Sequence, residues 1–137
     1  GFGADYAYTL DGSTVGEIEN ETFCADSAEV TVQGVNVHPG YAKGKMTNSM
    51  RVAAEILARW PKDQRPETTE KRQGFLHPIK MSGNVEKTTI NFIVRDFEEP
   101  GLKARERLLE AHPAAPVPAS ATLRRRATSE QVGRRRR

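Results

Sequence analysis

Three side chains in this 137-residue sequence have the type and the position to do chemistry. Asp11 follows the near-continuous apolar run 6–10, which predicts a strand buried on both faces, and precedes Gly12; a carboxylate at this position can bind a metal or transfer a proton. His38 lies in the turn sequence HPG after an apolar strand pattern, and its imidazole can exchange protons or bind a metal. Arg95 lies within another apolar strand pattern, and a guanidinium can bind a carboxylate through two hydrogen bonds.

Each of these residues also has an ordinary structural interpretation. Asp11-Gly12 can be a simple turn, and a strand-end histidine such as His38 is commonly a hydrogen-bonded structural residue. Arg95 can pair with an acid on an exposed face. The sequence contains no GxSxG, P-loop, CxxC, HExxH or EF-hand spacing. The residues alone therefore predict a small α+β domain and leave its function open.

The distribution of charge, the apolar runs and the cysteine content limit the classes of protein to which the chain can belong. Residues 111–137 hold seven arginines and one acid, a net charge of +6, whereas the other 110 residues carry 14 basic and 17 acidic side chains. The basic character therefore belongs to the tail, and the rest of the chain is mildly acidic. No apolar run approaches a membrane span. The single cysteine, Cys24, cannot form an internal disulfide and predicts a reducing compartment.

Hydrophobic periodicity predicts the elements. Residues 28–33 alternate as a strand, and Gly34 shifts the phase, which predicts a bulge or bend that re-aims His38. Residues 44–60 have helical spacing, with an apolar stripe of Met46, Met50, Ala53, Leu57 and Trp60. Strands are expected at 76–81 and 86–97, and a second helix begins at 99–100.

The order strand, helix, strand, strand, helix predicts a ferredoxin-like (split βαβ) α+β domain that lacks its last strand. Where that strand is expected, residues 113–137 are rich in alanine, proline and arginine and show no periodicity, so we expect disorder.

Four collinear blocks go further than the single residues: ADYAYTLDGSTVGEIENETF, NVHPGYAKGKMTN, PETTEKRQGFLHP and SGNVEKTTINFIVRDFEEPG. From Gly3 to about His112 the chain resembles the peptidase T family, the tripeptide aminopeptidases of the dizinc aminoacylase and carboxypeptidase clan. The resemblance implies a two-zinc α/β catalytic domain interrupted by a ferredoxin-like lid that forms the dimer. Residues 1–22 would end a catalytic-domain segment with a metal-ligand strand, residues 23–112 would be the lid, and 113–137 a tail, possibly read out of frame.

The resemblance also implies roles for four residues. Asp11 would be a terminal zinc ligand, and His38 would reach the active site of the partner subunit to stabilise the oxyanion. Arg95 would hold the carboxylate end of the peptide, and Asn48 would lie near the same pocket. Closure of the lid would bring His38 and Arg95 onto the substrate.

The function that the resemblance implies is zinc-dependent removal of the N-terminal residue from tripeptides by a cytoplasmic homodimer. The remaining zinc ligands and the catalytic glutamate of the family are absent from this sequence. We therefore expect the isolated chain to be inactive, and we expect a truncated or frameshifted reading frame behind the tail.

Two other functions compete with this one. The chain could be a non-enzymatic dimerisation or binding module derived from the lid, which would need a fourth strand or a partner that supplies one. The arginine-rich segment LRRRATSEQVGRRRR could bind nucleic acid, but it has no aromatic residues and adjoins an acidic domain, so this function ranks lowest.

Overall fold

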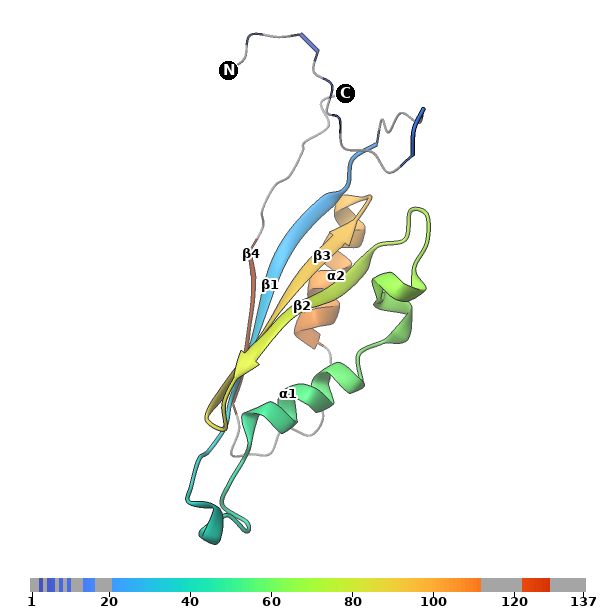
Figure 1. Cartoon of the computed structure of the whole chain (residues 1–137). Helices are drawn as coiled ribbons and strands as arrows, with labels where there is room; N and C mark the ends of the chain where they lie inside the picture. Colours follow the sequence, from blue (N-terminus) through green and yellow to red (C-terminus); the bar gives the residue numbers. More distant parts are fainter. Residues whose placement is uncertain are drawn as a thin grey trace.

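The computed structural model describes residues 3, 5, 6, 8, 10, 14–16 and 21–111, and the backbone of residues 122–128. Its main elements are β1 (Cys24–Gln33), α1 (Ser49–Ala58), β2 (Phe75–Gly83), β3 (Lys87–Asp96), α2 (Glu99–Ala111) and β4 (Thr122–Thr128). Short 3-10 helices lie at Pro39–Tyr41, Lys62–Gln64 and Pro66–Thr68. The strands form one antiparallel sheet in the order β2-β3-β1-β4, as Figure 1 shows. This confirms the ferredoxin-like α+β fold.

One part of that prediction needs correction, because the last strand is present. β4 pairs with β1 from Ser27↔Thr128 to Gln33↔Thr122. Residues 122–128 are therefore not disordered, whereas the other residues of the segment 113–137 lie outside the described part of the chain. The physical reason is that strand pairing uses backbone N–H and C=O groups, so the open edge of β1 can hold a segment of poor strand composition.

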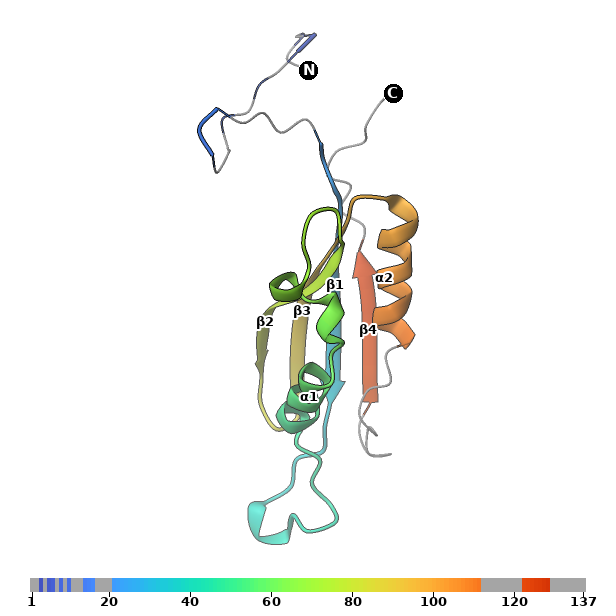
Figure 2. The same cartoon turned by 90° about the vertical axis from the view of Figure 1, so that its right-hand side faces the viewer.

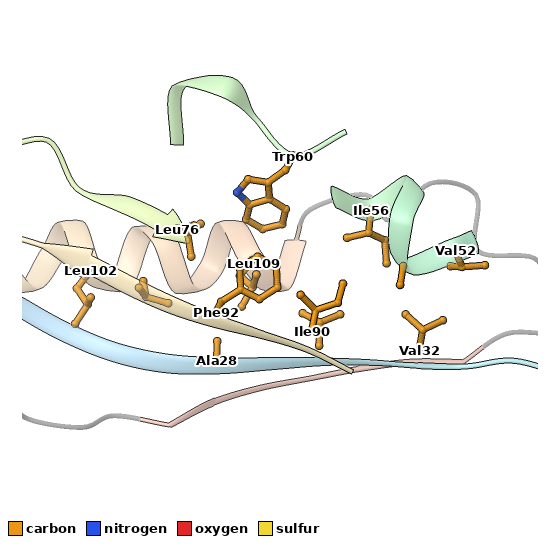
Figure 3. Packing of buried hydrophobic residues seen from close by; sticks show 13 residues of the cluster. Ala28, Val32, Val52, Ile56, Trp60, Leu76, Ile90, Phe92, Leu102 and Leu109 are labelled. Atoms are coloured by element: carbon orange, nitrogen blue, oxygen red, sulfur yellow. The ribbon is translucent and has the colours of Figure 1, made fainter. Parts of the chain in front are cut away.

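The hydrophobic core lies between one face of the sheet and the two helices, which cover the same face in Figure 2. Alternate residues of β1 and β3 point into it, and Trp60 stacks obliquely on Phe92 with ring centroids 5.1 Å apart. Each large buried side chain contributes roughly 1.5–3 kcal/mol. The core, part of which Figure 3 labels, consists of Ala28, Val30, Val32, Val52, Ala53, Ile56, Trp60, Leu76, Ile90, Phe92, Val94, Leu102 and Leu109.

The first helix is shorter than the predicted 44–60. It begins at Ser49 because the Asn48 side chain caps it, with Oδ1 accepting a hydrogen bond from the Met50 N–H at 3.0 Å. Val52, Ala53 and Ile56 supply its buried side, whereas Met50 is 40% exposed, so the predicted stripe was wrong at Met50. The predicted stripe and the buried one share Ala53, and packing against the sheet buries the side that carries Val52 and Ile56.

The phase shift at Gly34 marks the end of β1 and is not a bulge within it. A Cβ at Gly34 would lie 2.3 Å from the Thr47 carbonyl oxygen and 2.6 Å from that of Val85, so only glycine fits. Just beyond it, Val35 and Thr47 exchange two backbone hydrogen bonds of 2.9 Å. These bonds close the base of a loop, residues 36–46, that projects beyond the end of the sheet (Figure 1).

Those residues of the apolar run 6–10 that the structure describes do not form the expected buried strand. Tyr6, Tyr8 and Leu10 are 86%, 94% and 102% exposed and are not assigned to a strand. The described part of the chain offers them no neighbouring strand, and a strand buried on both faces needs neighbours in its own sheet. Asp11, predicted to follow this strand as a metal ligand, lies outside the described residues.

Candidate functional site

His38 lies on the projecting loop and is exposed to solvent. It precedes the 3-10 turn Pro39–Tyr41, in which the Tyr41 N–H donates to the His38 carbonyl oxygen at 2.9 Å. Its Nδ1 accepts a hydrogen bond from the Gly40 N–H at 3.1 Å, and its ring lies 5.7 Å from that of Tyr41. With Nδ1 turned toward the loop, Nε2 is the nitrogen that an external group can reach.

Arg95 lies at the other end of β3, on the sheet face opposite to the helices. Its neighbours Ala25 in β1 and Phe75 in β2 are its register partners. The guanidinium carbon lies 4.3 Å from the centroid of the Phe23 ring and 5.9 Å from that of Phe75. Such cation–π contacts orient a guanidinium without neutralising it. The half-buried Arg95 makes no ion pair with an acid among the described residues, and its Nε, buried there, has no hydrogen-bond partner.

A pocket of about 260 Å³ opens beside Arg95. Its lining combines apolar and charged side chains, among them Phe23, Pro66, Glu70, Lys71, Phe75 and Phe97. A cation set in an apolar lining is suited to a ligand that has a carboxylate and an apolar part. The sequence did not single out Phe23 or Phe75, and only the strand register could have shown that these rings contact Arg95.

Asp96, which also lines the pocket, forms an ion pair with Arg105. Arg105 also donates through Nη2 to the Gly74 carbonyl oxygen at 2.9 Å, which ties α2 to the start of β2. The other oxygen of Asp96 accepts the Glu98 N–H at 2.9 Å. Asp96 is buried, so these contacts replace water around its charge and fix the backbone on which Arg95 lies.

Asn48 lies with His38 and not with Arg95. It follows Thr47 at the base of the projecting loop, and its Oδ1 caps α1, as described above. The neighbouring Ser49 N–H donates to the Val85 carbonyl oxygen at 3.0 Å, so this end of the molecule adjoins the start of β3. The arrangement does not bring Asn48 into the Arg95 pocket of the same chain.

His38 and Arg95 are therefore not brought together within one chain. The projecting loop leaves the sheet where β3 starts at Lys87, and Arg95 lies eight residues further on, roughly 26 Å at about 3.3 Å per residue. Figure 1 shows the loop beyond one end of the sheet. The two ends of the sheet are separate candidate sites.

A third cluster of charges lies on the helix side of the sheet, near the Arg95 end but on the opposite face from Arg95. Asp26 of β1 is 5% exposed and lies 3.6 Å from the Lys103 ammonium group, which also contacts Glu106 at 3.0 Å. Burial, reinforced by Glu106, raises the pKa of Asp26 to about 6. Burial opposes ionisation of Glu106 as well, but hydrogen bonds from Asp26 and Lys103 outweigh it and lower the pKa of Glu106. A proton is therefore held on Asp26 in preference to Glu106.

The described residues do not form a zinc site. No group of three or more His, Cys, Asp or Glu side chains within residues 21–111 and the few described before them could hold a metal ion. Over the same residues, no helix is both long and apolar enough to cross a membrane.

Comparison with known proteins gives the class of protein to which this fold belongs. Residues 20–119 match the family model described as "Peptidase dimerisation domain", so the chain belongs to that family. It is also similar to the Peptidase T of Clostridium perfringens, with 54% identity over 106 residues. That match covers 77% of this chain and 26% of the relative, so the chain spans about a quarter of the relative's length.

Solved structures agree on the fold. An aminopeptidase PepT from Bacillus cereus matches 80% of this chain and 30% of its own, with a TM-score of 0.60 and 15% identity. A hydantoinase/carbamoylase family amidase from Burkholderia ambifaria matches 81% and 29%, with a TM-score of 0.63 and 16% identity. Enzymes with different names therefore carry this domain, and the fold alone does not select a substrate.

Proposed function

We propose that this chain is the lid and dimerisation part of a tripeptide aminopeptidase that removes the N-terminal residue from tripeptides. The observation that carries the proposal is the 54% identity to a Peptidase T across 106 residues, since the fold alone is shared with an amidase. The described residues contribute a histidine and an arginine at two ends of a sheet, and no group of side chains among them could hold a metal ion. The isolated chain is accordingly expected to be inactive.

In this proposal His38 acts in the active site of the partner subunit. An exposed imidazole on a projecting loop can reach a second molecule, and its outward Nε2 can donate to a carbonyl oxygen that becomes an oxyanion. One such donor contributes ~3–4 kcal/mol to transition-state stabilisation. Asn48, at the base of the same loop, keeps its side-chain NH₂ group for substrate while its Oδ1 caps α1.

Arg95 binds the carboxylate end of the peptide in the proposed enzyme. Its support is the geometry of the guanidinium, which rests on Phe23 and Phe75 and has no acidic partner in the described part of the chain. The pocket beside it has room for part of a small peptide. The roughly 26 Å along β3 between the two ends supports the assignment of His38 and Arg95 to different active sites of a dimer.

The resemblance implies two zinc ions in each active site of the complete enzyme, which would polarise the scissile carbonyl group and activate water. Asp11 would provide one ligand, and the others would come from outside this sequence. We also propose a cytoplasmic location, because a single cysteine fits a reducing compartment.

The proposed homodimer would form along β2, the edge strand opposite to β4. An edge strand offers unpaired backbone N–H and C=O groups to a second strand. Ile79 and Met81 on β2 are 53% and 48% exposed, so this edge also carries apolar side chains that a second copy could bury.

A second candidate function is a non-enzymatic dimerisation or binding module. One observation favours it: β4 covers the β1 edge, so the sheet needs no strand from another molecule on that side. A lid with its own fourth strand could persist without a catalytic domain.

A domain exchange tests the enzyme proposal. Residues 21–111 would replace the matching lid of the Clostridium perfringens Peptidase T, and tripeptide hydrolysis would be assayed with the isolated chain in parallel. We expect an active chimera, an inactive isolated chain, and a loss of roughly 100-fold in kcat/KM for His38→Ala. Arg51→Ala, an exposed arginine on α1, is the matched surface control and should be neutral. A folded, dimeric but inactive chimera would favour the binding module.

A further inference from the structure

We infer that Gly40 is a positioning residue for His38: its amide N–H holds the imidazole in the tautomer protonated at Nε2. The ring then presents a hydrogen-bond donor to whatever approaches the projecting loop. The catalytic meaning of this arrangement rests on the proposed function, whereas the arrangement itself follows from the loop geometry.

The hydrogen bond from Gly40 fixes the position of the proton on the neutral His38 ring. The Gly40 amide nitrogen lies 3.1 Å from Nδ1 of His38, and a backbone N–H can only donate. Nδ1 must therefore offer a lone pair, and the one N–H of a neutral imidazole must be at Nε2. The Tyr41 ring flanks the imidazole, with ring centroids 5.7 Å apart and a tilt of 49° between the rings.

The lack of a side chain at position 40 leaves room for the His38 ring. Gly40 does not have the positive φ of Gly44, so the backbone does not demand glycine at position 40. A Cβ there would lie 3.2 Å from Nδ1 and 3.4 Å from Cε1 of His38, with no other atom beyond its chain neighbours within 4 Å. The absence of a side chain at position 40 thus serves the imidazole specifically.

The tautomer protonated at Nε2 is the one that can stabilise an oxyanion. A carbonyl oxygen that gains negative charge is stabilised by a donor that is already oriented. With the opposite tautomer, Nε2 would present a lone pair to that oxygen and would repel it. The Gly40 amide therefore prepares His38 to act as a neutral donor before substrate arrives, which avoids reorientation of the ring during the reaction.

Nitrogen NMR of the full ¹⁵N-labelled chain tests this inference without zinc or peptide. In alkaline buffer, where imidazoles are neutral, we expect a protonated Nε2 and a bare Nδ1 for His38. We also expect a ¹⁵N–¹⁵N coupling across the bond from the Gly40 amide to Nδ1. His38→Gln identifies the signals of this ring.

Gly40→Pro should abolish the coupling and shift the ring toward a mixture of tautomers, because proline has no backbone N–H to donate to Nδ1. Gly44→Asn is the matched control in the same loop: a Cβ there meets no atom within 4 Å, and asparagine tolerates its φ of 70°. This control should keep the wild-type spectrum of His38.

A protonated Nδ1 in the wild-type chain, or a tautomer left unchanged by Gly40→Pro, would overturn the inference. Either result would leave the tripeptidase proposal standing, because that proposal depends on the activity of the chimera. Conversely, an inactive chimera with the expected spectrum would refute the proposed enzyme function, while the inference about the tautomer of His38 would stand.

Discussion

The two ends of the sheet hold their polar residues in different ways. His38 is exposed on a loop, and its side chain is held by one backbone hydrogen bond and one neighbouring ring. Arg95 is half-buried between two phenylalanine rings, above an ion pair that joins β3 to α2. A group that must reach another molecule needs projection, whereas a group that forms a pocket in its own molecule needs support. The contrast fits residues that serve two different active sites.

The largest expected effect tests the support at the Arg95 end. Arg105→Ala removes the partner of buried Asp96 and the donor to the Gly74 carbonyl oxygen. Loss of one member of a buried pair costs about 3–5 kcal/mol in free energy of unfolding. Chemical denaturation of the chain measures this loss, and Arg107→Ala on the same helix is the control. A change of Arg105→Ala within the error of the control would show that the Arg95 end is not held by this pair.

The next prediction tests the assignment to different active sites. In the chimera, His38→Ala and Arg95→Ala should each reduce kcat/KM by roughly 100-fold as homodimers. When the two variants are mixed and allowed to form heterodimers, one of the two active sites regains both residues. Each heterodimer should then recover about half of the wild-type activity, because one of its two symmetry-related sites is complete and the other lacks both residues.

The control for this experiment is a mixture of His38→Ala with the double variant, which cannot complete any site. If His38 and Arg95 acted in the same active site from the same subunit, the first mixture would stay as inactive as the separate variants. That outcome would overturn the proposed arrangement while leaving the enzyme class intact.

Strand periodicity explains how much of these ends the sequence could predict. The alternation in residues 28–33 and 86–97 reports one buried face, so it located β1 and β3 and identified Arg95 as a polar residue in an apolar strand. The HPG turn marked His38 because proline and glycine restrict backbone choices in a way that is visible locally. These features depend on residues close together in the chain.

The features that sequence reasoning missed depend on long-range pairing. The segment TLRRRAT has no alternation, and β4 forms through backbone bonds to β1 that any residue except proline can make. The contacts of Phe23 and Phe75 with Arg95 follow from strand register, and the distance between His38 and Arg95 follows from strand direction. The resemblance suggested one shared pocket for Arg95 and Asn48, and only the three-dimensional arrangement separates them within a chain.

The third prediction concerns pH and the charges between β1 and α2. The folded-state pKa of Asp26 is raised from 3.8 to about 6, so the stability linked to its protonation is present below pH 3.8 and is lost as pH rises to about 6. Asp26→Asn mimics the protonated carboxyl group. It should leave stability near pH 4 unchanged and raise the free energy of unfolding at pH 7 by about 1–2 kcal/mol, after allowance for the lost attraction to Lys103.

Urea denaturation at both pH values measures this difference, and Asp63→Asn on an exposed turn is the matched control. Glu106, whose pKa is lowered, has the opposite sign: its contribution is lost as pH falls. Equal stabilisation by Asp26→Asn at both pH values would show that the carboxyl pair does not share a proton. Such a result would leave the roles proposed for His38 and Arg95 unaffected, because the cluster faces the helices, whereas Arg95 lies on the other face of the sheet and His38 on the projecting loop.

The smallest expected effect concerns the proposed dimer, on which the comparison of the two ends depends. Met81→Lys places a charge on the exposed apolar edge of β2 without entering the core, since Met81 is 48% exposed. We expect the dimer of the chain to weaken by about tenfold or more, which corresponds to about 1.4 kcal/mol. Sedimentation over a concentration series measures the dissociation constant, with Met50→Lys on α1, where Met50 is 40% exposed, as the matched control away from this edge. If Met50→Lys weakened the dimer and Met81→Lys did not, the partner would bind over α1, and the proposed pairing along β2 would have to be abandoned.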